Sequence, residues 1–361
     1  MKIFKITSLV VMMSLMLADA CKAVDFPGGV NVSGDFRYRH DSIFMDGFDA
    51  THRHRIRARI GVSSAINNDL DVSLRLTSGS DMPTSSNQTL GDAFSTKSIG
   101  LDMACLTWTP DELNGASILA GKMVNPFLTV CDLVWDGDVT PEGLAIQYSQ
   151  DVSESSGAHV NAGFFWLEQR SSAPDTTLVV CQFAFDTQLD TFDVLLGVSV
   201  YAYQGMEGYA TLFEAGNGYG NSVTDAGLYA NDFVDTEFFL KAEGLLTDRP
   251  FAAYCSVVSN SKADSNQNGF IVGATLGKLK RADSWEVDVN YRSLQKDAVV
   301  GVLADSDAFG GGTDGKGLAL SGKYQISENW QAGLLCFFTQ VGISETEQDY
   351  SRYELDLSTK F

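Results

Sequence analysis

The segment from Arg53 to Val62 alternates charged and apolar side chains with a period of two residues. Because successive side chains of a β-strand point to opposite faces, the arginines share one face of a strand and the apolar residues the other. The arginines are Arg53, Arg55, Arg57 and Arg59, and the apolar residues are Ile56, Ala58, Ile60 and Val62. Such a strand fits either a soluble sheet over a core or the wall of a transmembrane barrel with a wet, charged lumen.

The same period recurs often enough to decide between these two structures. Alternating segments lie at residues 31–39, 53–62, 70–77, 99–105, 117–123, 144–148, 160–166, 179–185, 192–200, 237–246, 251–257, 270–276, 285–292, 318–326, 330–338 and 352–361. Their connections alternate between short and long, as periplasmic turns and external loops of a barrel do. The sequence therefore predicts an all-β protein, a transmembrane antiparallel β-barrel of about sixteen strands. In the segment 99–105 we expect Met103 and Cys105 to face outward with Ile99 and Leu101.

The N-terminal residues are typical of an export signal. Lys2 and Lys5 precede an apolar run at residues 9–17 and the small-residue sequence Ala18-Asp19-Ala20. This order predicts a signal peptide over residues 1–23 that is removed after export. After residue 23 no run approaches the roughly 18 apolar residues of a membrane helix. Residues 24–361 show no linker, so we expect one barrel domain, integral to the cell outer membrane and in contact with its lipid.

Charge and composition exclude some classes of partner. The formal net charge of −21 argues against a nucleic-acid partner, which requires a basic surface. The six cysteines lie far apart and do not resemble a disulfide framework, so buried or lipid-facing thiols are expected. His52 and His54 share a strand face, but neither a zinc signature nor a cofactor motif is present. We therefore expect no metal and no cofactor.

Several stretches resemble a family of outer-membrane porins of Gram-negative bacteria. They are residues 34–39, 53–60, 85–90, 121–127 and 133–138, and the likeness is most specific from about residue 28 to 150. The resemblance implies passive diffusion of small hydrophilic solutes and ions through a sixteen-stranded channel, commonly a trimer. The last strand, with Tyr353, Leu355, Leu357 and the terminal Phe361, is similar to the signal that the barrel-assembly machinery recognises. Cys105 departs from the family, which more often has an aromatic residue there.

The resemblance also implies a place for the chemistry. In sixteen-stranded porins the third external loop folds inward and narrows the lumen. Here that loop, residues 125–142, carries Asp132, Asp136, Asp138 and Glu142 and no basic residue. Opposite this loop we expect the lumen-facing arginines of the first strands: Arg37, Arg39, Arg53, Arg55, Arg57, Arg59 and Arg75. Carboxylates facing guanidiniums across confined water produce a transverse field that favours polar solutes.

Alternatives to this reading remain open. The arginines could instead pair along the wall with Asp35, Asp71 and Asp102. A surface adhesin or structural barrel with a closed lumen would use the long glycine-rich loops to bind a partner. An outer-membrane hydrolase needs a nucleophile, a base and an acid that converge in space. The four histidines are not accompanied by a Gly-x-Ser-x-Gly sequence, so we expect that the protein is not an enzyme.

Overall fold

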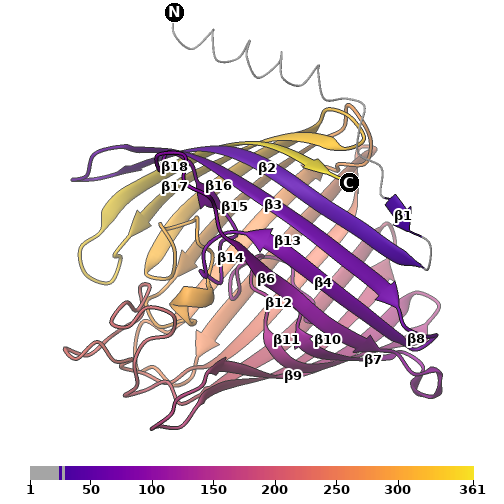
Figure 1. Ribbon diagram of the computed structural model, residues 1–361, viewed down its shortest axis with the longest axis horizontal. Coiled ribbons are helices and arrows are strands. Elements are labelled where there is room, and N and C mark those ends of the chain that lie inside the picture. Colours follow the sequence, from indigo (N-terminus) through magenta and orange to yellow (C-terminus); the bar gives the residue numbers. More distant parts are fainter. Residues whose placement is uncertain (1–23, 27–28) are drawn as a thin grey trace, which may run out of the picture.

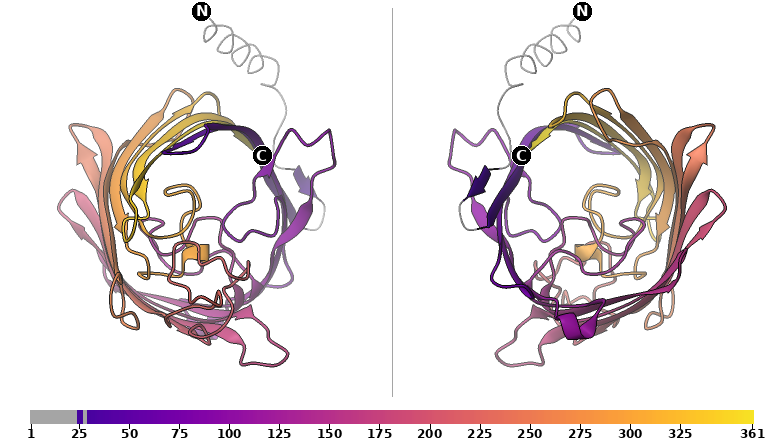
Figure 2. Two further views of the ribbon diagram at one scale, coloured as in Figure 1. Left: turned by 90° about the vertical axis from the view of Figure 1, so that its left-hand side faces the viewer. Right: turned by 90° about the vertical axis from the view of Figure 1, so that its right-hand side faces the viewer.

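A computed structural model describes residues 24–26 and 29–361, and its strands form a single closed antiparallel barrel (Figures 1 and 2). The predicted signal peptide, residues 1–23, lies outside the described residues. Within the part of the chain that the structure covers, no helix is long and apolar enough to cross a membrane. The prediction of an all-β barrel is confirmed.

The wall consists of sixteen strands, as the alternation predicted. Each strand pairs with the next, and β18 pairs with β2 to close the ring, with Leu355 opposite His40. They are β2 (Val30–Met45), β3 (Thr51–Ala65), β4 (Leu70–Ser78), β6 (Ile99–Trp108), β7 (Ala116–Lys122), β8 (Glu142–Ser153), β9 (Ser156–Glu168), β10 (Thr176–Leu189), β11 (Phe192–Gln204), β12 (Val234–Leu246), β13 (Arg249–Asn260), β14 (Asn268–Gly277), β15 (Trp285–Leu294), β16 (Gly315–Gln325), β17 (Trp330–Val341) and β18 (Gln348–Lys360). Two short strands add to the sheet: β1 (Val24–Phe26) pairs with β2, and β5 (Gln88–Thr89) pairs with β3.

The two faces of the wall differ in chemistry. On β15, Val287 and Val289 face outward and are 41% and 40% exposed, whereas the inward Asn290 and Arg292 are buried. Similar rows of exposed apolar side chains follow the other strands around the barrel. An outer surface of this kind is stable in lipid, because burial of apolar groups there costs nothing and every backbone group is paired within the closed sheet.

Strand β6 contains a β-bulge, and the bulge makes one prediction wrong. The register between β4 and β6 shifts next to Arg75, which leaves Asp102 as an extra residue. Beyond the bulge, the residues that would have pointed outward point inward instead. Met103 and Cys105 therefore face the interior and pack in a buried cluster. Leu106 takes the outward position instead. An inserted residue cannot be recognised from alternation alone, because each half of the strand alternates correctly.

The connections at the two ends of the barrel differ in length. One end has the turns 66–69, 109–115, 154–155, 190–191, 247–248, 278–284 and 326–329. The other end has eight loops that we name L1 to L8: residues 46–50, 79–98, 123–141, 169–175, 205–233, 261–267, 295–314 and 342–347. The short 3-10 helices η1 (Asp111–Leu113) and η2 (Gly301–Leu303) lie in a turn and in L7. Seen end-on, the orange segment that contains η2 lies inside the ring of strands (Figure 2).

An apolar cluster lies on one side of the barrel interior. Phe127 and Trp135 of L3 contact Phe165 on β9 and Tyr201 on β11 with ring centroids 5.5–6.3 Å apart. The indole Nε1 of Trp135 donates a hydrogen bond of 3.2 Å to the hydroxyl of Tyr203. Buried side chains of L5 and L7 extend the cluster. This packing fills part of the lumen and leaves the charged side of the interior open to water.

Loops L5 and L7 are joined by buried polar groups. Asn221 of L5 donates to the carbonyl of Val299 at 2.8 Å and accepts from the amide of Gly301 at 2.7 Å. The carboxylate of Asp297 accepts from the amide and the hydroxyl of Ser222 at 2.8 and 2.6 Å. These bonds satisfy polar groups that would otherwise be buried without partners, so the two loops form one ordered unit.

Candidate functional site

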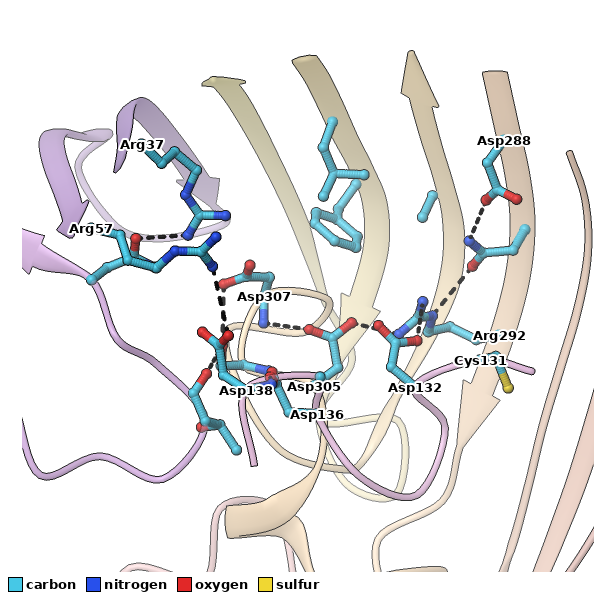
Figure 3. Close-up of a pocket in the computed structure, with 18 of the residues that line it drawn as sticks. Arg37, Arg57, Cys131, Asp132, Asp136, Asp138, Asp288, Arg292, Asp305 and Asp307 are labelled. Atoms are coloured by element: carbon cyan, nitrogen blue, oxygen red, sulfur yellow. Dashed lines mark hydrogen bonds and ion pairs between the residues drawn. The ribbon is translucent and has the colours of Figure 1, made fainter. Parts of the chain in front are cut away.

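A charged cavity of about 440 Å³ lies inside the barrel (Figure 3). Strands β2 and β3 bound it on one side, β13 and β15 bound it on the other, and L3 and L7 lie between them. Its charged lining includes Arg37, Arg57, Asp132, Asp136, Asp138 and Arg292. Five of these residues were predicted as site residues from the sequence, and two of them are among the seven predicted arginines.

Asp138 of L3 lies against the arginines of β3. Its Oδ1 is 3.6 Å from Nη1 of Arg57 and 3.6 Å from Nη1 of Arg59. Its other carboxylate oxygen accepts from the hydroxyl of Ser86 at 3.1 Å. The same two guanidiniums also pair with Asp35 on β2, at 3.0 Å for Arg57 and 2.7 Å for Arg59. The predicted loop-to-wall pairing and the alternative pairing along the wall therefore occur together.

The seam between β18 and β2 holds a second charged group, of which the sequence prediction named only Arg39. Arg39 pairs with Glu354 at 2.6 Å and with Asp356 at 2.7 Å, and the latter contact is bidentate. Arg352 on β18 pairs with Glu354 at 2.7 Å and with Asp41 at 3.2 Å. All but Asp356 are buried. Alternation places each of these side chains inward, but their pairing depends on closure between the first and last strands.

Asp307 of L7 joins this group from the lumen side. Its carboxylate lies 2.9 Å from Arg352 and 3.3 Å from Arg39. Although burial opposes ionisation, the nearby guanidiniums of Arg352, Arg39, Arg55 and Arg37 hold the pKa of Asp307 well below its usual range. Asp307 is therefore a fixed negative charge between L7 and the arginine wall.

The remaining predicted arginines pair with groups on the wall and on L2. Arg53 lies 2.6 Å from Asp41, and Arg55 lies 3.8 Å from the same carboxylate. Arg37 donates to the amide oxygen of Asn87 at 2.8 Å. Arg75 pairs with Asp102 at the bulge on β6, as the wall alternative predicted. The third carboxylate of that alternative, at position 71, is exposed at the start of β4.

The opposite wall is organised around Arg292 of β15. This guanidinium lies 3.0 Å from Asp132 of L3 and 2.5 Å from Asp305 of L7. Nearby, Asp288 accepts hydrogen bonds from the hydroxyl of Tyr254 at 3.1 Å and of Thr275 at 2.8 Å. Asp288 and Arg292 alternate with the apolar residues of the predicted segment 285–292, but nothing in the sequence connects them to the loops. Asp305 and Asp307, two residues apart in L7, are an acidic signal that could have pointed there.

Asp136 connects L3 to L7. Its amide donates to the carbonyl of Leu303 at 2.8 Å, and its carboxylate accepts from the amide of Ser306 at 3.0 Å. Burial, together with the neighbouring carboxylate of Asp305, raises the pKa of Asp136 to about 8. The fourth predicted loop carboxylate lies apart: Glu142 is the first residue of β8, is 62% exposed and pairs with Lys122 at 2.9 Å.

Metal-binding and disulfide groups contribute nothing to this site. Among the described residues, no group of three or more His, Cys, Asp or Glu side chains is placed to hold a metal ion. The five cysteines at positions 105, 131, 181, 255 and 336 are free thiols. The charged groups that line the cavity are carboxylates and guanidiniums.

The closed barrel, its apolar outer belt and its charged interior define a transmembrane protein of the outer-membrane β-barrel class. The chain belongs to the porin family whose model, described as "Putative porin", matches residues 22–235 and 249–361. It is an outer-membrane porin. None of the curated proteins matches the sequence.

Solved structures support the fold. OprB of Pseudomonas putida, in a high-pH structure, is 11% identical with a TM-score of 0.61, covering 92% of this chain and 94% of that one. OmpF of Salmonella typhi, in a complex with daunomycin, is 10% identical with a TM-score of 0.57, covering 93% and 99%. The trimer form of OmpT of Vibrio cholerae is 11% identical with a TM-score of 0.52, covering 92% and 100%.

Proposed function

We propose that this porin is a passive diffusion channel for small hydrophilic solutes and ions, narrowed by a charged constriction. L3 folds inward as the third external loop and crosses the lumen between two charged walls. The observation that carries this proposal is that one loop contacts both walls: Asp138 lies 3.6 Å from Arg57, and Asp132 lies 3.0 Å from Arg292. A solute that passes between them experiences a transverse field in confined water.

The proposal includes an orientation and an assembly. The end with the long loops faces the medium. The end with the short turns, where β2 begins and β18 ends, faces the periplasm. The outward residues Tyr353, Leu355 and Leu357, with the terminal Phe361, act as the recognition signal for the barrel-assembly machinery. The working unit is a trimer, for which the similarity to a trimeric barrel is the support.

Thiol modification in planar bilayers tests the constriction. Cys131 is first replaced in a Cys131→Ser background, because its thiol already lines the cavity. In this background Asp138→Cys is treated with a small, charged, membrane-impermeant thiol reagent during recording. We expect discrete conductance steps that fall when the reagent is added. Asp264→Cys, in the exposed loop L6, is the matched control and keeps its conductance. Unchanged steps in the Asp138→Cys protein would remove L3 from the pathway.

The same recording distinguishes the channel from the alternative, an adhesin or structural barrel with a closed lumen. The apolar cluster formed by L3, L5 and L7 favours that alternative, since it occupies part of the interior. The open charged cavity beside it favours the channel. Silent bilayers that contain correctly folded protein would establish the closed lumen and end the channel proposal.

One cluster of side chains bears on the alternative of a hydrolase. The hydroxyl of Ser149 lies 2.9 Å from Nδ1 of His159, and Nε2 of His159 lies 2.5 Å from Asp186, beside a cavity of about 280 Å³ near the short-turn end. The ring nitrogens are used in the reverse order from a serine hydrolase, where the carboxylate holds Nδ1 and the hydroxyl bonds Nε2. We expect no hydrolysis of p-nitrophenyl esters by the refolded protein. Turnover that Ser149→Ala abolishes would establish the hydrolase.

A further inference from the structure

We propose that the channel passes cations in preference to anions, so that its preferred solutes are small inorganic cations and ammonium-bearing molecules. This inference rests on the proposed function, because it assigns a charge class to solutes of the same cavity. An arginine ladder taken alone would indicate the opposite preference. The contacts inside the barrel reverse that expectation.

The arginine wall is close to neutral. Seven guanidiniums gather there: Arg37, Arg39, Arg53, Arg55, Arg57, Arg59 and Arg352. Six carboxylates lie within ion-pair distance of them: Asp35, Asp41, Asp138, Asp307, Glu354 and Asp356. Most of these arginine side chains are less than one fifth exposed. Their positive charge is therefore compensated next to the wall and acts weakly on ions in the cavity.

The opposite wall carries an excess of negative charge. Arg292 is shared by two carboxylates, Asp132 and Asp305. Asp288 also lines the cavity, and no described Lys, Arg or His lies within ion-pair distance of it.

The excess charge also lies where ions pass. The side chain of Asp132 is 42% exposed, whereas that of its partner Arg292 is 7% exposed. Asp288 lies on the same side of the cavity as Arg292, away from Arg37 and Arg57, and Tyr254 and Thr275 fix its orientation (Figure 3). Carboxylates lining a narrow passage with low-dielectric walls raise the local concentration of cations and lower that of anions.

Reversal potentials in a KCl gradient across a planar bilayer test this inference. The wild-type channel is expected to be more permeable to K⁺ than to Cl⁻. Asp288→Asn and Asp132→Asn should each lower that permeability ratio about twofold, and the double variant should lower it further. Asp264→Asn removes a carboxylate from the exposed loop L6 outside the cavity and should leave the ratio unchanged.

Wild-type measurements alone are also decisive if a variant fails to fold. The Debye length falls from about 10 Å at 0.1 M salt to about 3 Å at 1 M, so the preference for K⁺ should weaken at high salt. Conductance steps with a preference for Cl⁻, or with no preference, would overturn the inference and leave the channel intact. Absence of steps would overturn the proposed function itself. The two failures are therefore distinguishable.

Discussion

Asp138 of L3 and Arg57 of β3 lie 3.6 Å apart, which is a long contact for an ion pair. Each is also held by another group, Arg57 by Asp35 and Asp138 by Ser86. Partly solvated pairs of this kind contribute little to stability, typically about 0 to 1 kcal/mol. The relationship between these two residues is therefore more important for the field across the cavity than for the fold.

Substitution of Arg57 by glutamate provides the first test of that field. Arg57→Glu replaces a positive charge at the cavity with a negative one, and we expect the K⁺ over Cl⁻ permeability ratio to rise at least about twofold. The barrel should still assemble, because the strand pairing of β3 does not depend on this side chain. Lys280→Glu makes the same charge change in an exposed turn at the other end and serves as the control. An unchanged reversal potential for Arg57→Glu would remove this residue from the ion pathway.

The pH dependence of selectivity should report on Asp136. Its pKa is raised to about 8 from an ordinary value of 3.8, so the folded protein keeps the carboxyl neutral at mildly acidic pH. Its stabilising effect on the L3–L7 contact is complete below 3.8 and is lost as the pH rises through about 8. The same ionisation adds negative charge to the cavity. We expect the preference for K⁺ to increase between about pH 6 and about pH 9.

Asp136→Asn provides the matched measurement for that prediction. The amide has the same shape but does not ionise, so the increase in selectivity with a midpoint near pH 8 should disappear. The groups that face Asp136 most closely, Asp305 and Asp307, remain in this variant. A rise that persists unchanged in Asp136→Asn would assign the titration to another group.

The charged seam between β18 and β2 should contribute strongly to barrel stability. Arg39→Met removes the guanidinium that pairs with Glu354 and Asp356 and leaves buried carboxylate charge less compensated. We expect a loss of about 3 kcal/mol in the free energy of unfolding, measured by urea titration in detergent micelles. Lys241→Met breaks a half-exposed pair with Glu243 and should cost at most about 1 kcal/mol. Equal midpoints for the two variants would contradict the role given to the seam.

The terminal Phe361 is held against Gly34 by paired backbone hydrogen bonds of 2.9 and 3.0 Å. A Cβ at position 34 would collide with the ring of Phe361. Gly34→Leu and deletion of Phe361 should therefore both lower the fraction of folded protein recovered from outer membranes, scored by heat-modifiable gel migration. Gly322→Ala, where a Cβ meets open space, should have no effect. Normal recovery of both altered proteins would show that this contact and the predicted assembly signal are dispensable.

The period of two residues was sufficient to predict the strands because one face of every strand meets lipid. Predicted segments such as 144–148 are shorter than the strand found, Glu142–Ser153, since the polar ends of β8 extend beyond the apolar row. The bulge at Asp102 was missed because it inserts one residue between two segments that each alternate correctly. Local pattern thus predicts the wall but not its irregularities.

The cavity was predictable only in part. Alternation indicated that Arg37 and Arg57 face inward, and the resemblance indicated which loop carries their acidic partners. The contribution of Asp307 could not be predicted, because it depends on how L7 packs against β2, as in the 3.3 Å contact with Arg39, which is 268 residues away in sequence. The contact of Asp305 with Arg292 spans only 13 residues, but it depends on how L7 folds back over β15. The pairing of Glu142 with Lys122 likewise depends on the register between β7 and β8. That the cavity constricts a channel stays a prediction.

The polar contacts that join L5 to L7 affect which of the proposed external loops an antibody or a phage could bind. Segments bound to one another through Asn221 and Asp297 present few free backbone groups and should resist protease digestion. In the short loop L6, Asn266 accepts a hydrogen bond from the amide of Asp297 at 2.8 Å, whereas Ser265 is exposed at the tip. A peptide epitope inserted after Ser265 should be displayed on intact cells while the channel keeps its conductance, which makes this porin a candidate scaffold for surface display.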